Sequence, residues 1–244
     1  MLGERTLYEA YGDLARRIDD TIISSARYPF QAEAIAKIAP DIASKLCLER
    51  HHRLLEIGFG SGVVLTPLAN YVDEAIGIDQ DAYVERLHSS ASDNISLVKG
   101  TWPRSKPHGT FDRIVIYSVL HYLKDQGSAI AFVDAATEVL RIGGAILVGD
   151  LPNEDAWSRF ACTPFGRQFE AEWRKKTLDC DDPEVEEMRN IFAHAENTKW
   201  HIDDRFILDL VRRYRARGLE AYVLPQDRDL PFGHVREDVL ILRR

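Results

Sequence analysis

The sequence predicts an α/β fold built around a mostly parallel sheet. From Arg53 onward, short apolar runs alternate with stretches of helical character. The spacers between these runs, roughly 15–30 residues long, can hold the crossover helices that parallel strands require. A glycine-rich stretch, Gly58–Gly62, follows the first run and precedes an apolar helical segment. This strand–loop–helix order is typical of doubly wound sheets that bind a ligand at the loop.

Seven apolar runs are predicted to form the strands of this sheet. Five of them are separated by the long spacers and are expected to be parallel: Arg53–Ile57, Ala75–Ile78, Ile95–Val98, Arg113–Tyr117 and Ala145–Val148. Two more runs begin at Leu219 and Glu237 and are joined by a short loop. We expect these last two to form an antiparallel pair at the edge of the sheet.

Two helical segments are predicted outside the core of 53–151 and 201–244. Residues 1–52 form a helical cap, because their apolar positions recur at helical spacing until Tyr28–Phe30 interrupts them. Residues 152–200 are too long for a bare loop in a compact domain, so a partly helical insertion is expected beside the site. The alternatives for the insertion are a lid that closes over the site and a surface elaboration that merely covers the sheet.

The composition excludes several classes of protein. The chain has 244 residues, 45% of them hydrophobic, and a formal charge of −8, which argues against broad attraction to nucleic acid or anionic membranes. Its three cysteines are far apart and form no CxxC pair, so a disulfide framework is not predicted. The first residues are charged and lack a signal peptide, and no run is long enough to cross a bilayer. We therefore expect a cytoplasmic protein without membrane association, and leave open whether it forms a homodimer.

The glycine loop favours a cationic or zwitterionic ligand. Its glycines are Gly58, Gly60 and Gly62, whereas a dinucleotide-binding loop would have its third glycine at Val63. The preceding strand ends with Glu56, whose carboxylate would repel a pyrophosphate and attract an ammonium group.

The second strand ends in an acid, Asp79. A carboxylate at this point can accept hydrogen bonds from both hydroxyls of a ribose. The alternative is a helix N-cap or turn residue. The register with the glycine loop favours the ligand role.

At this point the sequence resembles the class I S-adenosylmethionine-dependent methyltransferases. The matching segments are "LLEIGFGSG", "GIDQD", "FDRIVIYSVLHYL" and "VLRIGGAILVGD", which follow one another over roughly residues 53–150. The resemblance implies a Rossmann-like sheet of seven strands, with the last strand antiparallel. It also implies S-adenosylmethionine as the cofactor.

The resemblance assigns cofactor roles to residues of these segments. Glu56 would lie near the ammonium group, Asp79 would hold the ribose, and Gln80 would lie beside the adenosine. Thr101 stands where the family often has an acid facing the adenine, and Trp102 would cover the ring, although packing is the alternative for a large aromatic after a strand. The other predicted cofactor-binding residues are Gly58, Gly60, Gly62 and Ser118.

The candidate catalytic residues follow the fourth and fifth strands. His121 and Asp150 are expected to face the acceptor, because ligands in open α/β sheets bind at the carboxyl ends of strands. An unperturbed histidine titrates near neutral pH, which makes His121 the best candidate base; a helix turn bordering the cofactor is its alternative role. His194 and His201 are further candidates if the insertion folds over the site.

No metal site is predicted. Asp79, Asp112 and Asp150 are the carboxylates that invite one. Asp112 starts its strand, however, at the opposite end of the sheet, so the three do not form a ligand set.

The predicted function is methyl transfer to a small molecule, with a hydroxyl oxygen as the expected acceptor. A carbohydrate or surface-polysaccharide precursor is suggested by "GDLPN" and the aromatic-rich insertion. The alternatives are a protein that binds S-adenosylmethionine without catalysis and a nucleic-acid methyltransferase. The latter is disfavoured by the acidic charge and by "YSVLHY" after the fourth strand.

Overall fold

A seven-stranded sheet forms the centre of the computed structural model, which describes residues 6–195 and 200–244. Residues 1–5 of the predicted cap and 196–199 of the predicted insertion lie outside the described residues. The strand order is β3-β2-β1-β4-β5-β7-β6. The strands are β1 Arg53–Ile57, β2 Glu74–Asp79, β3 Ile95–Lys99, β4 Phe111–Tyr117, β5 Leu140–Pro152, β6 Glu220–Pro225 and β7 Arg236–Leu242.

The pairing of the strands confirms the predicted fold class. Strands β1 to β5 are parallel to one another, whereas β7 is antiparallel to both β5 and β6. In β1, every residue from Leu54 to Ile57 is buried. A strand buried on both faces reads as a continuous apolar run, and such runs are the pattern from which the parallel sheet is predicted.

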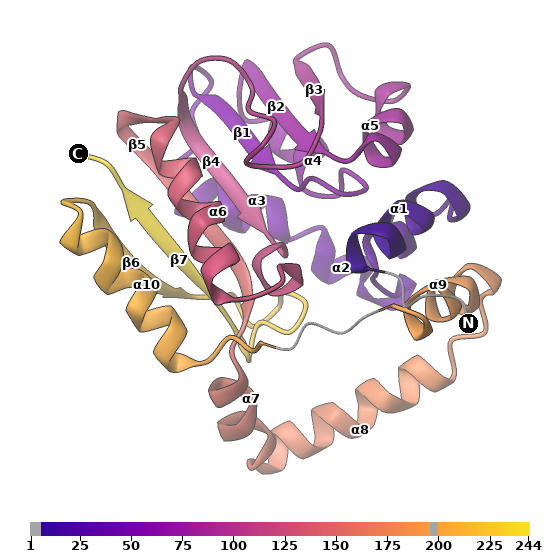
Figure 1. Ribbon diagram of the computed structural model, residues 1–244. Helices are drawn as coiled ribbons and strands as arrows, with labels where there is room; N and C mark the ends of the chain where they lie inside the picture. Colours follow the sequence, from indigo (N-terminus) through magenta and orange to yellow (C-terminus); the bar gives the residue numbers. More distant parts are fainter. Residues whose placement is uncertain (1–5, 196–199) are drawn as a thin grey trace.

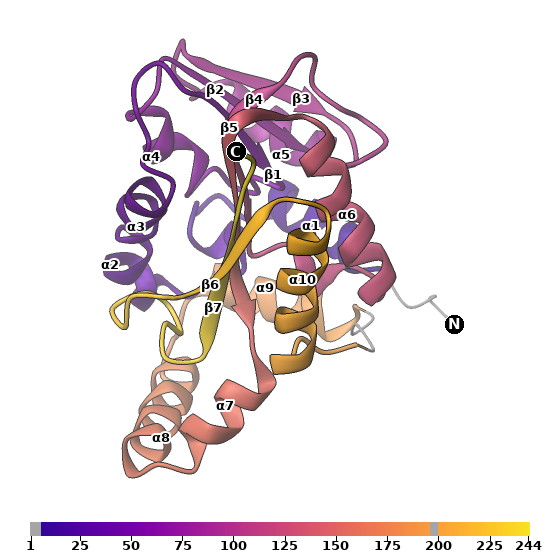
Figure 2. The same ribbon diagram turned by 90° about the vertical axis from the view of Figure 1, so that its left-hand side faces the viewer.

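Helices cover both faces of this sheet. The α-helices are α1 Leu7–Arg17, α2 Ala32–Ile35, α3 Ile38–Lys45, α4 Leu65–Ala69, α5 Asp81–His88, α6 Gln126–Glu138, α7 Glu154–Ala161, α8 Pro164–Leu178, α9 Pro183–Ala193 and α10 Asp204–Ala216. Short 3₁₀ helices are η1 Ile23–Ser25, η2 Pro29–Gln31 and η3 Leu120–Tyr122. Figure 2 shows the sheet between α3 and α4 on one side and α6 and α10 on the other.

The two faces of the sheet bury separate apolar cores. Phe132 and Val133 of α6 and Leu210 of α10 pack on one face. Ile42 of α3 and Leu68 of α4 belong to the core on the other face. The sheet is therefore fixed from both sides, which gives the loops at its carboxyl edge a rigid base.

The helices α1 and α9 form a third apolar cluster beside the carboxyl edge of the sheet. Leu14 of α1 packs in one cluster with Val185, Met188 and Ile191 of α9. The carboxylate of Glu184 accepts hydrogen bonds from the two backbone N–H groups that follow α1, at 2.8 and 2.9 Å. In Figure 1, α8 and α9 lie on the side of the sheet where β5 ends, and α9 lies next to α1.

The fifth strand is longer than predicted. The prediction covers Ala145–Val148, but β5 begins at Leu140 and continues to Pro152. The outer part pairs with β7, where Leu151 faces Glu237 and Pro152 faces Arg236. Pairing with a strand from the end of the chain is not visible in the local apolar pattern.

None of the helices in residues 6–195 and 200–244 combines the length and the apolar character needed to cross a membrane.

Candidate functional site

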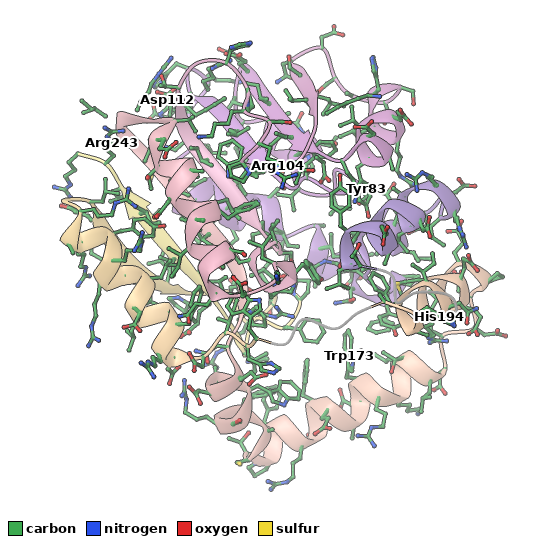
Figure 3. The ribbon with its side chains drawn as sticks, viewed as in Figure 1. Tyr83, Arg104, Asp112, Trp173, His194 and Arg243 are labelled. Atoms are coloured by element: carbon green, nitrogen blue, oxygen red, sulfur yellow. The ribbon has the colours of Figure 1, made fainter. Side chains whose placement is uncertain are left out.

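One cavity of about 390 Å³ opens at the carboxyl edge of the sheet. It brings together ten of the eleven predicted site residues: Glu56, Gly58, Gly60, Asp79, Gln80, Thr101, Trp102, Ser118, His121 and Asp150. Gly62 does not line it. The cap contributes Tyr8 and Tyr11 of α1, and the insertion contributes Trp173 of α8. Figure 3 shows Trp173 extending from α8 toward the body of the molecule.

The first two glycines of the loop serve different purposes. Gly58 has a φ of 81°, and an added Cβ there would lie 2.6 Å from the side chain of Val119. Gly60 has a φ of 54° and lines the cavity, yet an added Cβ would meet no atom within 4 Å. Packing therefore requires glycine at position 58, whereas at position 60 the free space belongs to the cavity.

The third glycine, Gly62, supports packing. An added Cβ there would lie 2.9 Å from Leu87 of α5. Its role is thus to let the loop approach α5, and the prediction that it contacts the cofactor finds no support in the lining of the cavity.

Two carboxylates meet at the ends of β1 and β2. Glu56 is 2% exposed, and its Oε2 has no hydrogen-bond partner among the described residues. Burial, with a further contribution from the charge of Asp79, raises the pKa of Glu56 well above its usual value. Such an orphaned acid is stabilised by a cation, so this end of the cavity suits an ammonium or sulfonium group.

Asp79 holds the glycine loop in place. Its two oxygens accept hydrogen bonds from the backbone N–H groups of Gly60 and Gln80, both at 2.7 Å. Burial raises the pKa of Asp79 to about 6, although these two hydrogen bonds act in the opposite direction. The carboxylate therefore has a defined orientation at the point where a ribose is expected.

The cap borders the end of the cavity where the adenosine is expected. Gln80 Nε2 donates to the carbonyl of Tyr8 at 3.2 Å, and the Thr101 hydroxyl donates to the Tyr8 hydroxyl at 3.3 Å. Trp102 is buried, and its indole N–H donates to the carbonyl of Phe132 at 3.0 Å. Trp102 thus packs in the core while one part of it lines the cavity.

The opposite end of the cavity is built on two residues with left-handed backbone. Ser118 follows β4 with a φ of 59°, and Asp150, in the outer part of β5, has a φ of 58°. Non-glycine residues in this region store strain and are frequent at functional sites. The Ser118 hydroxyl is in close contact with Asp150 Oδ2, and Arg27 Nη2 donates to both, at 3.0 and 3.2 Å.

Two arginines keep Asp150 ionised. Burial alone would raise the pKa of Asp150, but Arg236 and Arg27 outweigh burial and hold the pKa below its usual value. The Arg236 Nε lies 3.7 Å from Asp150 Oδ1, an oxygen without a hydrogen-bond partner among the described residues. Asp150 is therefore an anion with one oxygen still able to accept a hydrogen bond.

His121 lies in the same region and is neutral at physiological pH. Burial, together with the charge of Arg236, lowers the pKa of His121 to about 3. Its ring packs against Tyr122, with the ring centroids 3.9 Å apart. A histidine with so low a pKa is a weak base.

Comparison with known proteins identifies the fold and the domain. A family model described as a methyltransferase domain matches residues 55–148. A ubiquinone biosynthesis O-methyltransferase of Bradyrhizobium sp. (strain ORS 278) is 24% identical over 164 residues, which cover 64% of this chain and 58% of that protein. The chain thus spans less than two thirds of the length of this relative.

Solved structures of methyltransferases share the whole architecture. The N-methyltransferase NodS of Bradyrhizobium japonicum WM9, in complex with S-adenosyl-L-homocysteine, superposes with a TM-score of 0.56 at 17% identity, covering 96% of this chain and 98% of that one. The pyocyanin biosynthetic protein PhzM superposes with a TM-score of 0.59 at 15% identity, covering 96% and 62%. Residues 55–148 thus match a methyltransferase domain, and the chain has the fold of these methyltransferases.

The residues of the site fit S-adenosylmethionine. Glu56 offers an unpaired buried oxygen to a cation, Asp79 is fixed beside the loop, and Gly60 leaves space for close approach of a ligand. These features come from the residues themselves, and they agree with S-adenosylmethionine as the cofactor of the family.

The two further histidines offered as candidate bases do not line the main cavity. His194 is exposed at the end of α9, where its Nδ1 lies 2.9 Å from the Asn190 carbonyl. His201 is exposed and pairs with Glu154 at 2.5 Å. His201 lines a neighbouring cavity of about 420 Å³ and neither histidine lines the main one. The cavity that His201 lines is shared with His121 and with Pro152, the last residue of β5.

Asp112 lies where the sequence predicts it, far from the site. It accepts a hydrogen bond from the Arg53 N–H at 2.8 Å and pairs with Arg141 at 3.1 Å. Figure 3 shows it on the opposite side of the molecule from Trp173.

One group of residues in the described part of the chain has the spacing of metal ligands: Glu49, His51 and His52. It precedes β1 and does not line the cavity. His52 Nδ1 already accepts a hydrogen bond from the Glu49 N–H at 2.9 Å.

Several residues that line the cavity or join it to the cap were not predicted. Arg27 comes from the turn after η1, Arg236 is the first residue of β7, and Phe232 precedes β7. Tyr83 of α5 donates to the carbonyl of Ser24 at 2.8 Å and so joins the core to the cap. The only local signal was "ARYPF", in which an arginine precedes the helix-breaking stretch.

Proposed function

We propose that this methyltransferase transfers a methyl group from S-adenosylmethionine to a hydroxyl oxygen of a small molecule. The observation that carries the proposal is that the two ends of one cavity hold different functional residues. Its β1–β2 end holds Glu56 and Asp79, which suit the cofactor, and its β4–β5 end holds Ser118 and Asp150 beside open space. Cofactor and acceptor can therefore meet within a single enclosed volume.

Alignment is the chief task of the protein in this reaction. The bound cofactor supplies a methyl group on a sulfonium, and the acceptor oxygen must lie in line with the carbon–sulfur bond. Ser118 and Asp150 are rigid anchors for such alignment, because their backbones are fixed at strand ends and their side chains contact each other and Arg27. Residues of the cap and of α8 line the same cavity.

Asp150 is the residue that we propose to receive the acceptor hydroxyl. Its Oδ1 has room for a hydrogen bond, and its ionised state suits an oxygen that loses a proton during transfer. His121, whose pKa is lowered to about 3, is uncharged and lines the cavity nearby. Since neither group is a strong base, methyl transfer is expected to depend more on alignment than on proton abstraction.

The curated relative named above is an O-methyltransferase, which supports oxygen as the acceptor atom. The finer suggestion, a carbohydrate acceptor, is supported by the aromatic residues Tyr28, Trp173 and Phe232 in the cavity wall. Flat aromatic faces pack well against the apolar face of a sugar ring. The lid role predicted for residues 152–200 is also part of the proposal, because Trp173 of that segment lines the cavity.

The test is mass spectrometry of products formed from S-adenosylmethionine and a panel of hydroxylated small molecules. A methylated product and S-adenosylhomocysteine should appear together with at least one hydroxyl compound. The Asp79→Asn variant should lose cofactor affinity by about 1–3 kcal/mol, and Asp112→Asn at the far end should not. Cofactor binding without transfer to any acceptor would favour the binding protein without catalysis.

A further inference from the structure

The charged residues that line the main cavity form two groups, one at each end. Glu56 and Asp79 lie at the ends of β1 and β2, where the cofactor is expected. Arg27, Arg236 and Asp150 lie at the other end. Among the described residues that line the cavity, Asp150 is the only acid at the end that holds the two arginines.

Asp150 neutralises only one of the two guanidinium groups. Arg27 Nη2 lies 3.2 Å from Asp150 Oδ2, and Arg236 Nε lies 3.7 Å from Asp150 Oδ1. His121 is neutral and adds no charge. The acceptor end of the cavity therefore has an excess positive charge.

Both arginines also have unused hydrogen-bond donors. Arg27 uses Nη2 for Ser118 and Asp150, and in the described residues its Nε and Nη1 groups have no acceptor. Arg236 donates from Nη1 to the Asp150 carbonyl at 3.2 Å, which leaves its Nη2 without an acceptor in the same part of the chain. Their side chains are only 12% and 19% exposed. The buried polar atoms that lack a partner in the described residues include none of these donors, so the donors reach the cavity, where an anion would accept hydrogen bonds from them.

The wall next to these donors is aromatic. The rings of Trp173 and Phe232 are 4.5 Å apart and tilted by 58°, and the ring of Tyr28 lies 5.9 Å from Trp173 in an edge-on arrangement. The guanidinium of Arg236 lies over the Phe232 ring at 5.5 Å, so the charge and the aromatic wall adjoin each other. A ligand that fits both features has an apolar face and an anionic group.

We propose that the methyl acceptor is a small hydroxy acid whose carboxylate is held by Arg27 and Arg236. This inference rests on the proposed function and narrows its substrate class. The body of the acid packs against Tyr28, Trp173 and Phe232, and its hydroxyl reaches Asp150 Oδ1. An aromatic hydroxy acid and a sugar acid share this chemistry.

The cofactor has a carboxylate of its own, so the experiment must separate two anions. Binding is measured by titration calorimetry on protein saturated with S-adenosylhomocysteine, which occupies the cofactor end. The probes are matched acid and amide pairs: 4-hydroxybenzoate with 4-hydroxybenzamide, and glucuronate with glucuronamide. The amide keeps the shape of the acid and removes the charge.

At least one acid should bind about tenfold or more tightly than its amide, the effect expected from charge-assisted hydrogen bonds to arginine. The pair that shows the preference identifies the body as aromatic or sugar. Arg27→Gln and Arg236→Gln should each abolish the preference, while affinity for S-adenosylhomocysteine changes by less than about twofold. The matched control is Arg141→Gln, which breaks an arginine–aspartate pair at the far end of the sheet and should leave the preference intact.

Equal binding of acid and amide in both pairs would overturn the inference. It would also be overturned if Arg27→Gln or Arg236→Gln weakened S-adenosylhomocysteine binding and left the preference in place, because that arginine would then serve the cofactor. Should a glutamine variant fail to fold, Arg27→Lys and Arg236→Lys keep the charge, alter the hydrogen bonds and are expected to reduce the preference only in part. Failure of the proposed function is distinct: it is the absence of methyl transfer, which a binding preference does not affect.

Discussion

Asp79, at the end of β2, makes the stability of the cofactor-free protein depend on pH. Burial raises the pKa of Asp79 from 3.8 to about 6 in the folded chain. A carboxyl with a raised pKa favours the folded state most when it is protonated, below its unfolded pKa. This stability is lost as the pH rises through about 6.

We therefore predict that the free energy of unfolding of the cofactor-free protein falls between pH 4 and pH 7. The fall should be smaller in Asp79→Asn, by up to about 3 kcal/mol for a shift of this size. Urea unfolding at several pH values measures the effect, with Asp112→Asn as the control. An identical pH dependence in Asp79→Asn and the unaltered protein would contradict a buried, raised Asp79.

The glycines of the loop offer a second test at the residue scale. Gly60→Ala is expected to fold with a loss of about 1 kcal/mol for the left-handed backbone, because its Cβ meets open space. Its cofactor affinity should nevertheless fall, since that space belongs to the cavity. Gly58→Ala should instead destabilise the fold, because its Cβ would lie 2.6 Å from Val119. Calorimetry and thermal unfolding of both variants separate the two roles, and normal cofactor binding by Gly60→Ala would exclude close approach of a ligand at this glycine.

A site residue could be predicted where neighbouring residues in the sequence determine its place. It could not be predicted where contacts between distant segments of the chain determine it. Glu56, Gly60 and Asp79 lie in segments whose local order identifies them, because strand, loop and helix follow one another. Arg27 and Arg236 could not be predicted, since their positions depend on tertiary contacts between the cap, β5 and β7. The low pKa of His121 could not be predicted from the sequence either, because burial is a property of the folded chain.

At the scale of elements, α9 is the connection between the insertion and the cap. Met188 is 5% exposed and packs in the cluster with Leu14 and Ile18 of the α1 segment. Arg17 adds an ion pair with Glu187 at 3.1 Å. These contacts fix the position of Tyr11, whose ring lies 5.2 Å from Phe192 of α9 and which lines the cavity.

We predict that Met188→Ala weakens this docking by about 2–5 kcal/mol, the usual cost of a truncated buried methionine. The ratio of kcat to KM for the acceptor should fall more than cofactor affinity, because the acceptor end depends on the cap. Leu178→Ala is the control, since Leu178 of α8 is 77% exposed. Steady-state kinetics and calorimetry on both variants make the measurement, and equal kinetics in both would argue against a link between α9 and the acceptor end.

The elements of the core were predictable because their apolar runs are continuous. The insertion was harder, since α7 has no buried residue and α8 buries only Gly166. Their helical state depends instead on caps such as Asn153, which accepts hydrogen bonds from two N–H groups of α7, and Thr163, which caps α8.

At the scale of the whole molecule, the cap, the insertion and the sheet enclose the cavity jointly. The cap contacts the core through Arg86 of α5, which donates to the carbonyls at the end of α1, and through Tyr83. The insertion contacts the cap through the cluster of α1 and α9. A ligand that orders one of these parts should consequently order the others.

We predict that S-adenosylhomocysteine slows amide hydrogen exchange in α1 and α9 together, although the predicted cofactor contacts include no residue of α9. The expected cause is that the cofactor contacts the cap near Tyr8 and the cap in turn holds α9 through Leu14 and Glu184. Helix α10 on the far face of the sheet serves as the internal reference and should change little beyond the global stabilisation. Hydrogen exchange with mass spectrometry resolves these helices in one experiment. In Met188→Ala the protection of α9 should be lost while that of α1 remains, because the variant weakens only the contact between them. Protection confined to the glycine loop and α1 in the unaltered protein would mean that the insertion senses no cofactor, and the closure proposed for residues 152–200 would then have to depend on the acceptor alone.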